Sequence, residues 1–152
     1  MLENDIQKDR ERWPFFPPLP RARLRQEQDQ PDLWIVLQGL EARDLPQPLR
    51  QILPHLAGDK AGVVKGPAML ETGARVILVD PEQETISGEA AHRRALMQAA
   101  KQIRDLALGK VAFALGAHSD NVLQAWIEGF RVGWFRVAVE MKDPPEILVE
   151  SR

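Results

Sequence analysis

The side chains that could do chemistry in this chain are few and widely spaced. The sequence has three histidines, His55, His92 and His118, and it has neither cysteine nor tyrosine. The histidines fall in three separate predicted elements, so they lack the close spacing of a metal site. Ser87 and Ser119 are candidate nucleophiles by type, but each stands at the start of a predicted helix, where a hydroxyl accepts a backbone N–H. The residues therefore predict no catalytic group, metal or cofactor.

Two turns that follow predicted strands could form a ligand cleft. A phosphate cradle needs glycines and free backbone N–H groups at the start of a helix. The turn at 80–84 is acidic and lacks glycine, whereas the turn at 116–119 begins with glycine but is followed by an aspartate. Both turns therefore disfavour phosphate. If a small molecule binds at the carboxyl ends of parallel strands, its predicted cleft contains four residues of these turns: Asp80, Gly116, His118 and Ser119.

The elements that would position these turns centre on one strand–helix–strand unit. The runs 75–79 and 111–115 are continuously apolar and contain β-branched residues, as expected for strands buried on both faces. Between them, apolar residues recur at helical spacing, with Ser87 as the N-cap and Gly109 as the left-handed residue that closes the helix. The unit predicts a parallel pair of strands joined by a right-handed crossover.

Further elements are predicted on both sides of this unit. Strands are predicted at 21–25, 33–37, 63–65 with 68–71, 137–139 and 147–149. A helix within 39–66 is predicted from the apolar stripe Leu45, Leu49, Ile52, Leu53 and Leu56. Another helix runs from 119 to about 135 and carries Gly129 and Gly133. Each glycine costs about 1 kcal/mol relative to alanine inside a helix, which predicts close packing against the sheet or another helix.

Residues 21–25 alternate three arginines with apolar residues, as an edge strand with one solvated face would. The arginines could bind phosphate or DNA, but Glu27, Asp29 and Asp32 follow closely and offset their charge. The net charge of −2 also disfavours a nucleic-acid partner. The simpler interpretation is a strand edge kept soluble by its charges.

We predict an N-terminal arm at 1–20 and one α/β domain at 21–152. The arm places Trp13, Phe15 and Phe16 among four prolines, which favours an extended path. These aromatic residues either cover the surface of their own domain or contact a partner or a second copy of the chain. No apolar run approaches the roughly 20 residues of a membrane span, and the start lacks a signal-peptide core, so we expect a cytoplasmic protein without membrane contact.

The order of these elements resembles the N-terminal domain of the leucyl (cytosol) aminopeptidase family, the dinuclear-metal M17 peptidases. Residues 56–62 resemble the family's Gly-Asp-Phe-x-Gly-Lys loop, and 73–79 resemble the strand before its Gly-Leu-Gly. Residues 95–106 are similar to its alanine-rich crossover helix, 125–136 to the helix with Glu-Gly and Gly-x-Tyr-Arg-Phe, and 144–149 to the last strand of the domain. The similarity covers about 21–150.

The chain also departs from that family. Asp80-Pro-Glu82 stands in place of Gly-Leu-Gly, and Trp134 stands where tyrosine is usual. The chain ends where the peptidase domain of the family would begin, so the metal-binding and catalytic residues of the family have no counterpart here. We therefore expect no peptidase activity.

The resemblance implies a three-layer, macro-domain-like α/β fold with a mixed, mainly parallel sheet and helices on both faces. In the aminopeptidases this domain is an accessory part that contributes to hexamer assembly. The resemblance thus predicts a non-catalytic accessory or assembly domain, which would bind itself as a homo-oligomer, or a peptidase-type partner, through the aromatic residues of the arm. The alternative is a macro-type module that binds a nucleotide or ADP-ribose in the predicted cleft.

Overall fold

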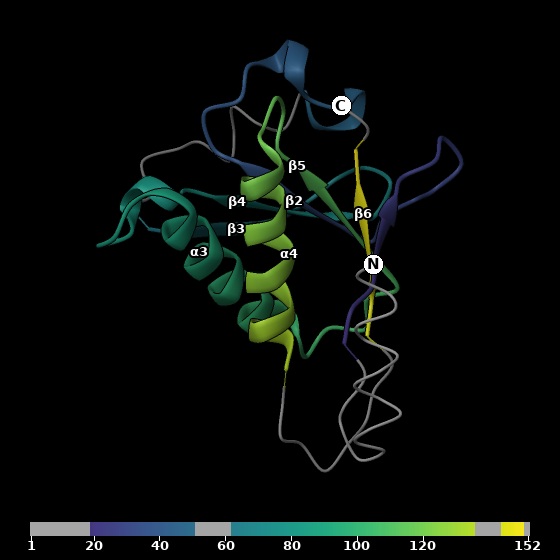
Figure 1. The fold of residues 1–152 in the computed structure, drawn as a ribbon. Helices are drawn as coiled ribbons and strands as arrows, with labels where there is room; N and C mark the ends of the chain where they lie inside the picture. The colour runs from purple at the N-terminus through teal and green to yellow at the C-terminus, as the bar shows by residue number, and fades with distance from the viewer. Residues whose placement is uncertain (1–18, 51–61, 136–143, 151–152) are drawn as a thin grey trace.

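The computed structural model describes residues 19–50, 62–135 and 144–150. These residues build one six-stranded sheet in the order β1-β6-β5-β2-β4-β3 (Figure 1). Every neighbouring pair is parallel except β3 and β4, which are antiparallel. The predicted mixed, mainly parallel α/β fold is confirmed. The strands are β1 (Ala22–Leu24), β2 (Leu33–Leu37), β3 (Val64–Met69), β4 (Arg75–Val79), β5 (Lys110–Ala114) and β6 (Glu146–Val149).

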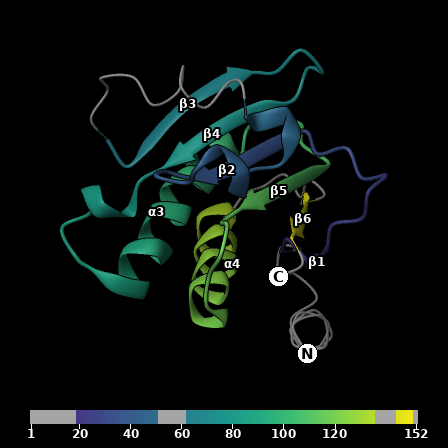
Figure 2. The same cartoon turned by 90° about the horizontal axis from the view of Figure 1, so that it is seen from above.

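Each face of the sheet has its own apolar core. On one face, α3 (Gly88–Ile103) and α4 (Asp120–Trp134) lie side by side (Figures 1 and 2), and their apolar residues meet Ile35, Ile77 and Phe113 of the sheet. A short 3-10 helix, η3 (Pro81–Gln83), leads from β4 towards α3. On the opposite face, η1 (Ala42–Asp44) and η2 (Gln47–Leu49) bring apolar residues against Trp34 and Val36. The sheet therefore forms the middle layer of three.

The helix predicted within 39–66 is wrong for the described part of that range. Leu45 and Leu49 are buried as the apolar stripe predicts, but Leu45 is the C-cap of the 3-10 helix η1 and Leu49 is the last residue of the 3-10 helix η2. Pro46 caps η2 and Pro48 lies inside it, and a proline disrupts the hydrogen bonding of a continuous α-helix. The rest of the stripe lies outside the described residues.

The strands joined by α3 are parallel, as predicted, but they do not pair with each other. Strand β2 lies between them, with Ile35 level with Ile77 of β4 and with Phe113 of β5. Because β2 is apolar on both sides, it can take this central place and bury both of its faces. The crossover through α3 therefore spans a strand that precedes it in the chain.

The two helices approach each other most closely at the glycines of α4. A Cβ added to Gly129 would lie 2.1 Å from the carbonyl oxygen of Arg93, and one added to Gly133 would lie 2.2 Å from that of Met97. Both neighbours are backbone atoms of α3. The predicted close packing is confirmed, and its partner is the other helix.

The ends of α3 differ from the prediction. Ser87 is the N-cap residue, but its side chain makes no capping hydrogen bond. At the other end the helix stops at Ile103, six positions before Gly109, and Gly109 is not left-handed. Instead, the N–H groups of Gly109 and Lys110 both donate to the carboxylate of Asp32, at 2.7 and 3.0 Å. A distant carboxylate thus holds this segment extended at the start of β5.

Two of the three arginines at 21–25 are paired with carboxylates. Arg23 donates to both oxygens of Asp29 at 2.8 Å and also to Glu146, and Arg25 donates to Glu150 at 2.6 Å. The Arg23 guanidinium holds the pKa of the Asp29 carboxyl well below its usual range. These pairs support the interpretation of 21–25 as a soluble strand edge and leave little charge for a phosphate.

Several predictions concern residues outside the described part of the chain. The aromatic arm residues Trp13, Phe15 and Phe16, the histidine His55 and the strand predicted at 137–139 all fall there. By contrast, the interrupted strand predicted around 63–71 is confirmed as β3, with a shift of register between Lys65 and Ala68.

Candidate functional site

The topology of the sheet creates a point of divergence between the carboxyl ends of β2 and β5. These strands are parallel neighbours, but the chain leaves them towards opposite faces. After β2 it continues through η1 and η2, where the buried Leu45 and Leu49 pack on one face, and after β5 it enters α4 on the other. Where two such connections diverge, the carboxyl ends of the strands are left uncovered, and α/β proteins bind ligands at such points.

A cavity of about 490 Å³ lies next to this point, over the carboxyl ends of β5 and β6, and no residue of β2 lines it. One wall is the segment around η1 (43–46), and the other is the turn from β5 into α4 (115–118). The ends of β5 and β6 and the residue after β1 complete the lining. In Figure 1 this edge of the sheet faces the top, where η1 lies above the strands.

The deeper walls of the crevice are apolar. Phe113 and Val149 are partners in the register of β5 and β6, so their side chains meet at the same level. Leu45, Leu115 and Leu123 add aliphatic surface from the two connecting segments and from α4. Successive side chains of a strand point to opposite faces of the sheet, so only every second side chain of β5 and β6 lies on the same face as Phe113 and Val149.

Gly116 and His118 shape the turn between β5 and α4. Gly116 has φ 66°, and a Cβ there would lie 2.7 Å from Cδ2 of Leu40, so only glycine fits without displacing that leucine. The Nδ1 atom of His118 lies 2.7 Å from the carbonyl oxygen of Gly116. Because a carbonyl only accepts, Nδ1 carries the proton. The Nε2 atom is buried and has no hydrogen-bond partner within the described chain.

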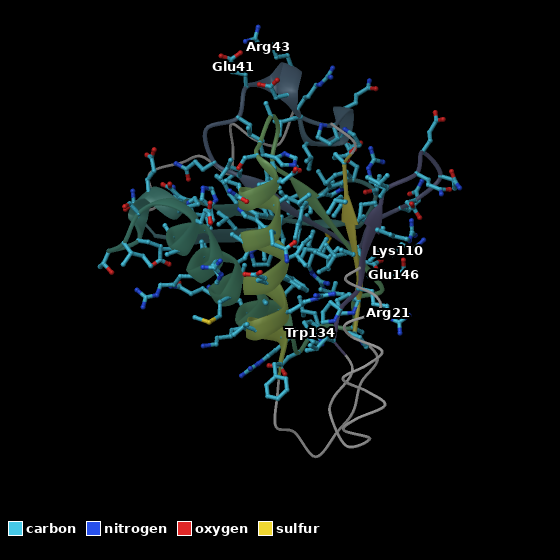
Figure 3. All side chains as sticks on the ribbon, in the orientation of Figure 1. Arg21, Glu41, Arg43, Lys110, Trp134 and Glu146 are labelled. Carbon is cyan, nitrogen blue, oxygen red and sulfur yellow. The ribbon has the colours of Figure 1, made fainter. Side chains whose placement is uncertain are left out.

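Both arginines of the crevice are paired with carboxylates, whereas Asp44, which also lines it, belongs to neither pair. The guanidinium of Arg25 donates to Glu150 through Nε at 2.6 Å and through Nη2 at 3.3 Å, and it lies 5.4 Å from the ring centroid of Trp34. At the mouth, Arg43 pairs with Glu41 at 2.8 Å. Figure 3 shows these last two side chains next to each other at the outer end of the molecule.

The structure brings together two of the four predicted cleft residues. Gly116 and His118 line the crevice, whereas Asp80 and Ser119 do not. Asp80 ends β4, on the far side of β2, and its carboxylate accepts the N–H of Glu82 at 3.2 Å. The Ser119 hydroxyl accepts the N–H of Val122 at 3.2 Å and caps α4, as predicted.

Sequence reasoning missed most of the remaining lining. Arg25 was recognised only as part of a charged edge, because its partner Glu150 lies 125 residues away in the chain. Phe113 and Val149 are recognisable as strand residues, but nothing in their local pattern indicates that they border a cavity. Their position follows from the strand order, which the sequence does not display.

His92 has a structural role in the contact between the two helices. Its Nδ1 atom accepts a hydrogen bond of 2.9 Å from the indole Nε1 of Trp126, which is fully buried. Burial lowers the pKa of the His92 imidazole. His92 therefore belongs to the packed contact between α3 and α4, because the bulky Trp126 extends from α4 to reach it.

The described residues contain neither a cluster of metal-binding side chains nor a helix that could span a membrane. Across 19–50, 62–135 and 144–150, no three histidine, aspartate or glutamate side chains gather closely enough to hold a metal ion. Within the same ranges, no helix combines the length and the apolar character needed to cross a bilayer.

Comparisons with known proteins give a similarity of fold alone. No protein-family model matches the chain, and no curated protein does. Nineteen chains of solved structures match, among them a mutant of tomato leucine aminopeptidase. That match has a TM-score of 0.48 and 16% sequence identity, and it covers 90% of this chain and 33% of the aminopeptidase. The chain thus spans about a third of the length of that protein.

Proposed function

We propose that the chain is a non-catalytic binding domain that holds a small molecule in the crevice at the carboxyl edge of its sheet. The observation that carries the proposal is the cavity between the diverging connections after β2 and β5, lined by Gly116 and His118. Its volume of about 490 Å³ lies within the range of about 300–1,000 Å³ of small-molecule sites. Its mainly apolar walls with a few polar groups fit the same class.

The proposal of a binding role rather than a catalytic one rests on what the polar groups at this edge already do. The Ser119 hydroxyl and the Asp80 carboxylate each cap a helical turn. The Nδ1 proton of His118 is held by a backbone carbonyl, not by a carboxylate that would orient a general base. Among the described residues of the crevice, no side chain is paired with His118 as a nucleophile would be.

The experiment is a binding measurement by NMR on the full chain. The probes are benzyl alcohol, benzoate and benzylamine, which share one ring and differ in charge. We expect at least one probe to shift the backbone amide signals of 115–118 in a saturable way. Ala117→Trp should abolish these shifts, because the exposed Ala117 lines the crevice and an indole would fill it. Ala90→Trp, at an exposed position on α3, is the matched control. If no probe moves these signals, the proposal is wrong.

A second candidate function is assembly through protein contacts, as an accessory domain that binds a second copy or a peptidase-type partner. A specific observation supports it. Arg131 of α4 donates from Nε to the carbonyl oxygen of Pro20 at 2.9 Å, so the chain that follows the arm starts beside this helix. Val132 of the same helix is 57% exposed. An exposed apolar residue on the helix that contacts Pro20 would suit a contact surface.

The assembly proposal is tested by light scattering on the full chain. We propose Trp13, Phe15 and Phe16 as contact residues, and a variant with serine at all three positions should have a lower mass than the unmodified chain at equal concentration. Arg43→Ser, at an exposed position that Figure 3 shows at the opposite end of the domain from Arg21, is the control. A monomeric mass for the unmodified chain across the concentration range would contradict self-assembly.

A further inference from the structure

The charges around the crevice indicate which molecules it can accept. Two arginines and two carboxylates line it, so their formal charges cancel. Arg25 is neutralised at short range, because Glu150 engages its Nε and Nη2 atoms and the Trp34 ring supports its face. A guanidinium held in this way contributes little net attraction to a second anion.

The charges at the mouth of the crevice also offset one another. Arg43 already pairs with Glu41, and both side chains are mostly exposed to water, so their field is screened. The next residue, Asp44, lines the crevice and adds a carboxylate. An incoming anion therefore meets at least as much negative as positive charge. Asp44 belongs to neither ion pair, but it is exposed to water, so its attraction for an incoming cation is screened.

The backbone around the crevice does not form an anion cradle either. Phosphate sites use glycines whose open Cα side lets the ligand approach the N–H groups. At Gly116 that open side is occupied by Leu40. The nearby start of α4 carries Asp120 in its first turn, and a carboxylate at this position offsets the positive end of the helix dipole.

We infer that the crevice selects an uncharged, largely apolar small molecule, such as one with an aromatic or aliphatic ring, over nucleotides and other ions. The inference rests on the proposed binding function and names the ligand class of the same site. Its physical basis is that a charge moved from water into an apolar cavity needs a new partner, which the paired arginines and carboxylates do not supply. A ring against Phe113 and Leu45 loses no such interaction.

The test compares the affinities of the three phenyl probes and of AMP for the crevice, measured from the amide signals of 115–118. We expect benzyl alcohol to bind at least about tenfold more tightly than benzoate or benzylamine, a difference that corresponds to about 1.4 kcal/mol. AMP should bind more weakly still. Binding that is strongest for benzoate, benzylamine or AMP overturns this inference but leaves the proposed function intact. Binding by none of them removes both.

A charge variant makes the test sharper. Glu150→Gln leaves Arg25 without its carboxylate, so the preference should move towards benzoate by about tenfold or more. Glu146→Gln is the matched control, because Glu146 pairs with Arg23 on β1. Both glutamates are partly exposed, with 33% and 48% of their side chains accessible, so both variants should fold. An unchanged preference in Glu150→Gln would contradict the role given to the Arg25–Glu150 pair.

Discussion

The contact between α3 and α4 makes a quantitative prediction for Gly129→Ala. The added methyl group would lie 2.1 Å from the carbonyl oxygen of Arg93, and its next neighbours, at 2.9 and 3.0 Å, are also backbone atoms of that residue. No rotamer change can relieve this overlap. Since carbon and oxygen atoms approach to about 3.3 Å, the helices must separate by roughly 1 Å.

The expected cost of Gly129→Ala follows from two opposing effects. Overpacking in a close-packed core costs about 1–3 kcal/mol, and this site belongs at the upper end because backbone has to move. Alanine returns about 1 kcal/mol of helix propensity. The net destabilisation is therefore about 2 kcal/mol, which lowers the Tm by roughly 4–8 °C in a chain of this size.

Urea unfolding followed by tryptophan fluorescence measures this change, since Trp126 is fully buried on the same helix. Gly133→Ala should behave alike, and the double variant should cost less than the sum, because one separation of the helices relieves both overlaps. Val132→Ala, at a 57% exposed position of α4, should change stability by less than about 0.5 kcal/mol. A Gly129→Ala variant as stable as the unmodified chain would refute the packing argument.

Three further predictions concern hydrogen bonds and pH. Asp32→Ala removes the acceptor of two N–H groups at the start of β5 and should cost about 1 kcal/mol in urea unfolding; an unchanged midpoint would show that water replaces the carboxylate. The pKa of His92 is lower in the folded than in the unfolded chain, so the unfolded chain binds more protons and stability should fall as the pH drops below about 6.5. His92→Gln should flatten this part of the stability profile, and a profile unaffected by the substitution would contradict the role of the bond to Trp126. The pKa of Asp29 is depressed by Arg23, so its contribution to stability is present above about pH 3.8 and is lost as the pH falls further. Asp29→Asn should weaken the pH dependence of the free energy of unfolding in that acid range. An unchanged dependence below about pH 3.8 would contradict a stabilising role of the Arg23–Asp29 ion pair.

The local pattern of the sequence was sufficient to place the central strands and helices. Strand β4 has the predicted bounds, and so does β2, because a continuous apolar run between polar turns determines a buried strand locally. The start of α4 at Ser119 was predictable for the same reason, since a capping hydroxyl and its N–H are three residues apart.

The sequence-based predictions of secondary structure were wrong where the residue that decides the local conformation lies far away in the chain. The end of α3 was predicted too late because Gly109 looks like a helix terminator, whereas its N–H is bound by Asp32, 77 residues away. In the segment around η1 and η2, the apolar spacing suggested a helix, but the prolines and the packing of Leu45 and Leu49 on the sheet decided for short 3-10 turns.

The candidate site likewise contains residues that the local sequence predicts and residues that only the tertiary contacts bring in. Gly116 and His118 were predictable because they follow a strand and precede a helix. The exclusion of Asp80 depends on β2 lying between β4 and β5, and the inclusion of Arg25 depends on β1 pairing with β6.

The sequence by itself determined the strands, the amphipathic helices and the two glycines that let those helices meet, because each follows from contacts or conformations within a few residues. The tertiary structure alone decided the order of the strands, the crevice beside η1 at the carboxyl edge of the sheet, and the pairing of Arg23 with Glu146 and of Arg25 with Glu150. The physical reason is that apolar strands of similar composition can pair in many orders with similar local energies. Only the combined burial of all layers selects one order, and the crevice and its charges follow from that selection.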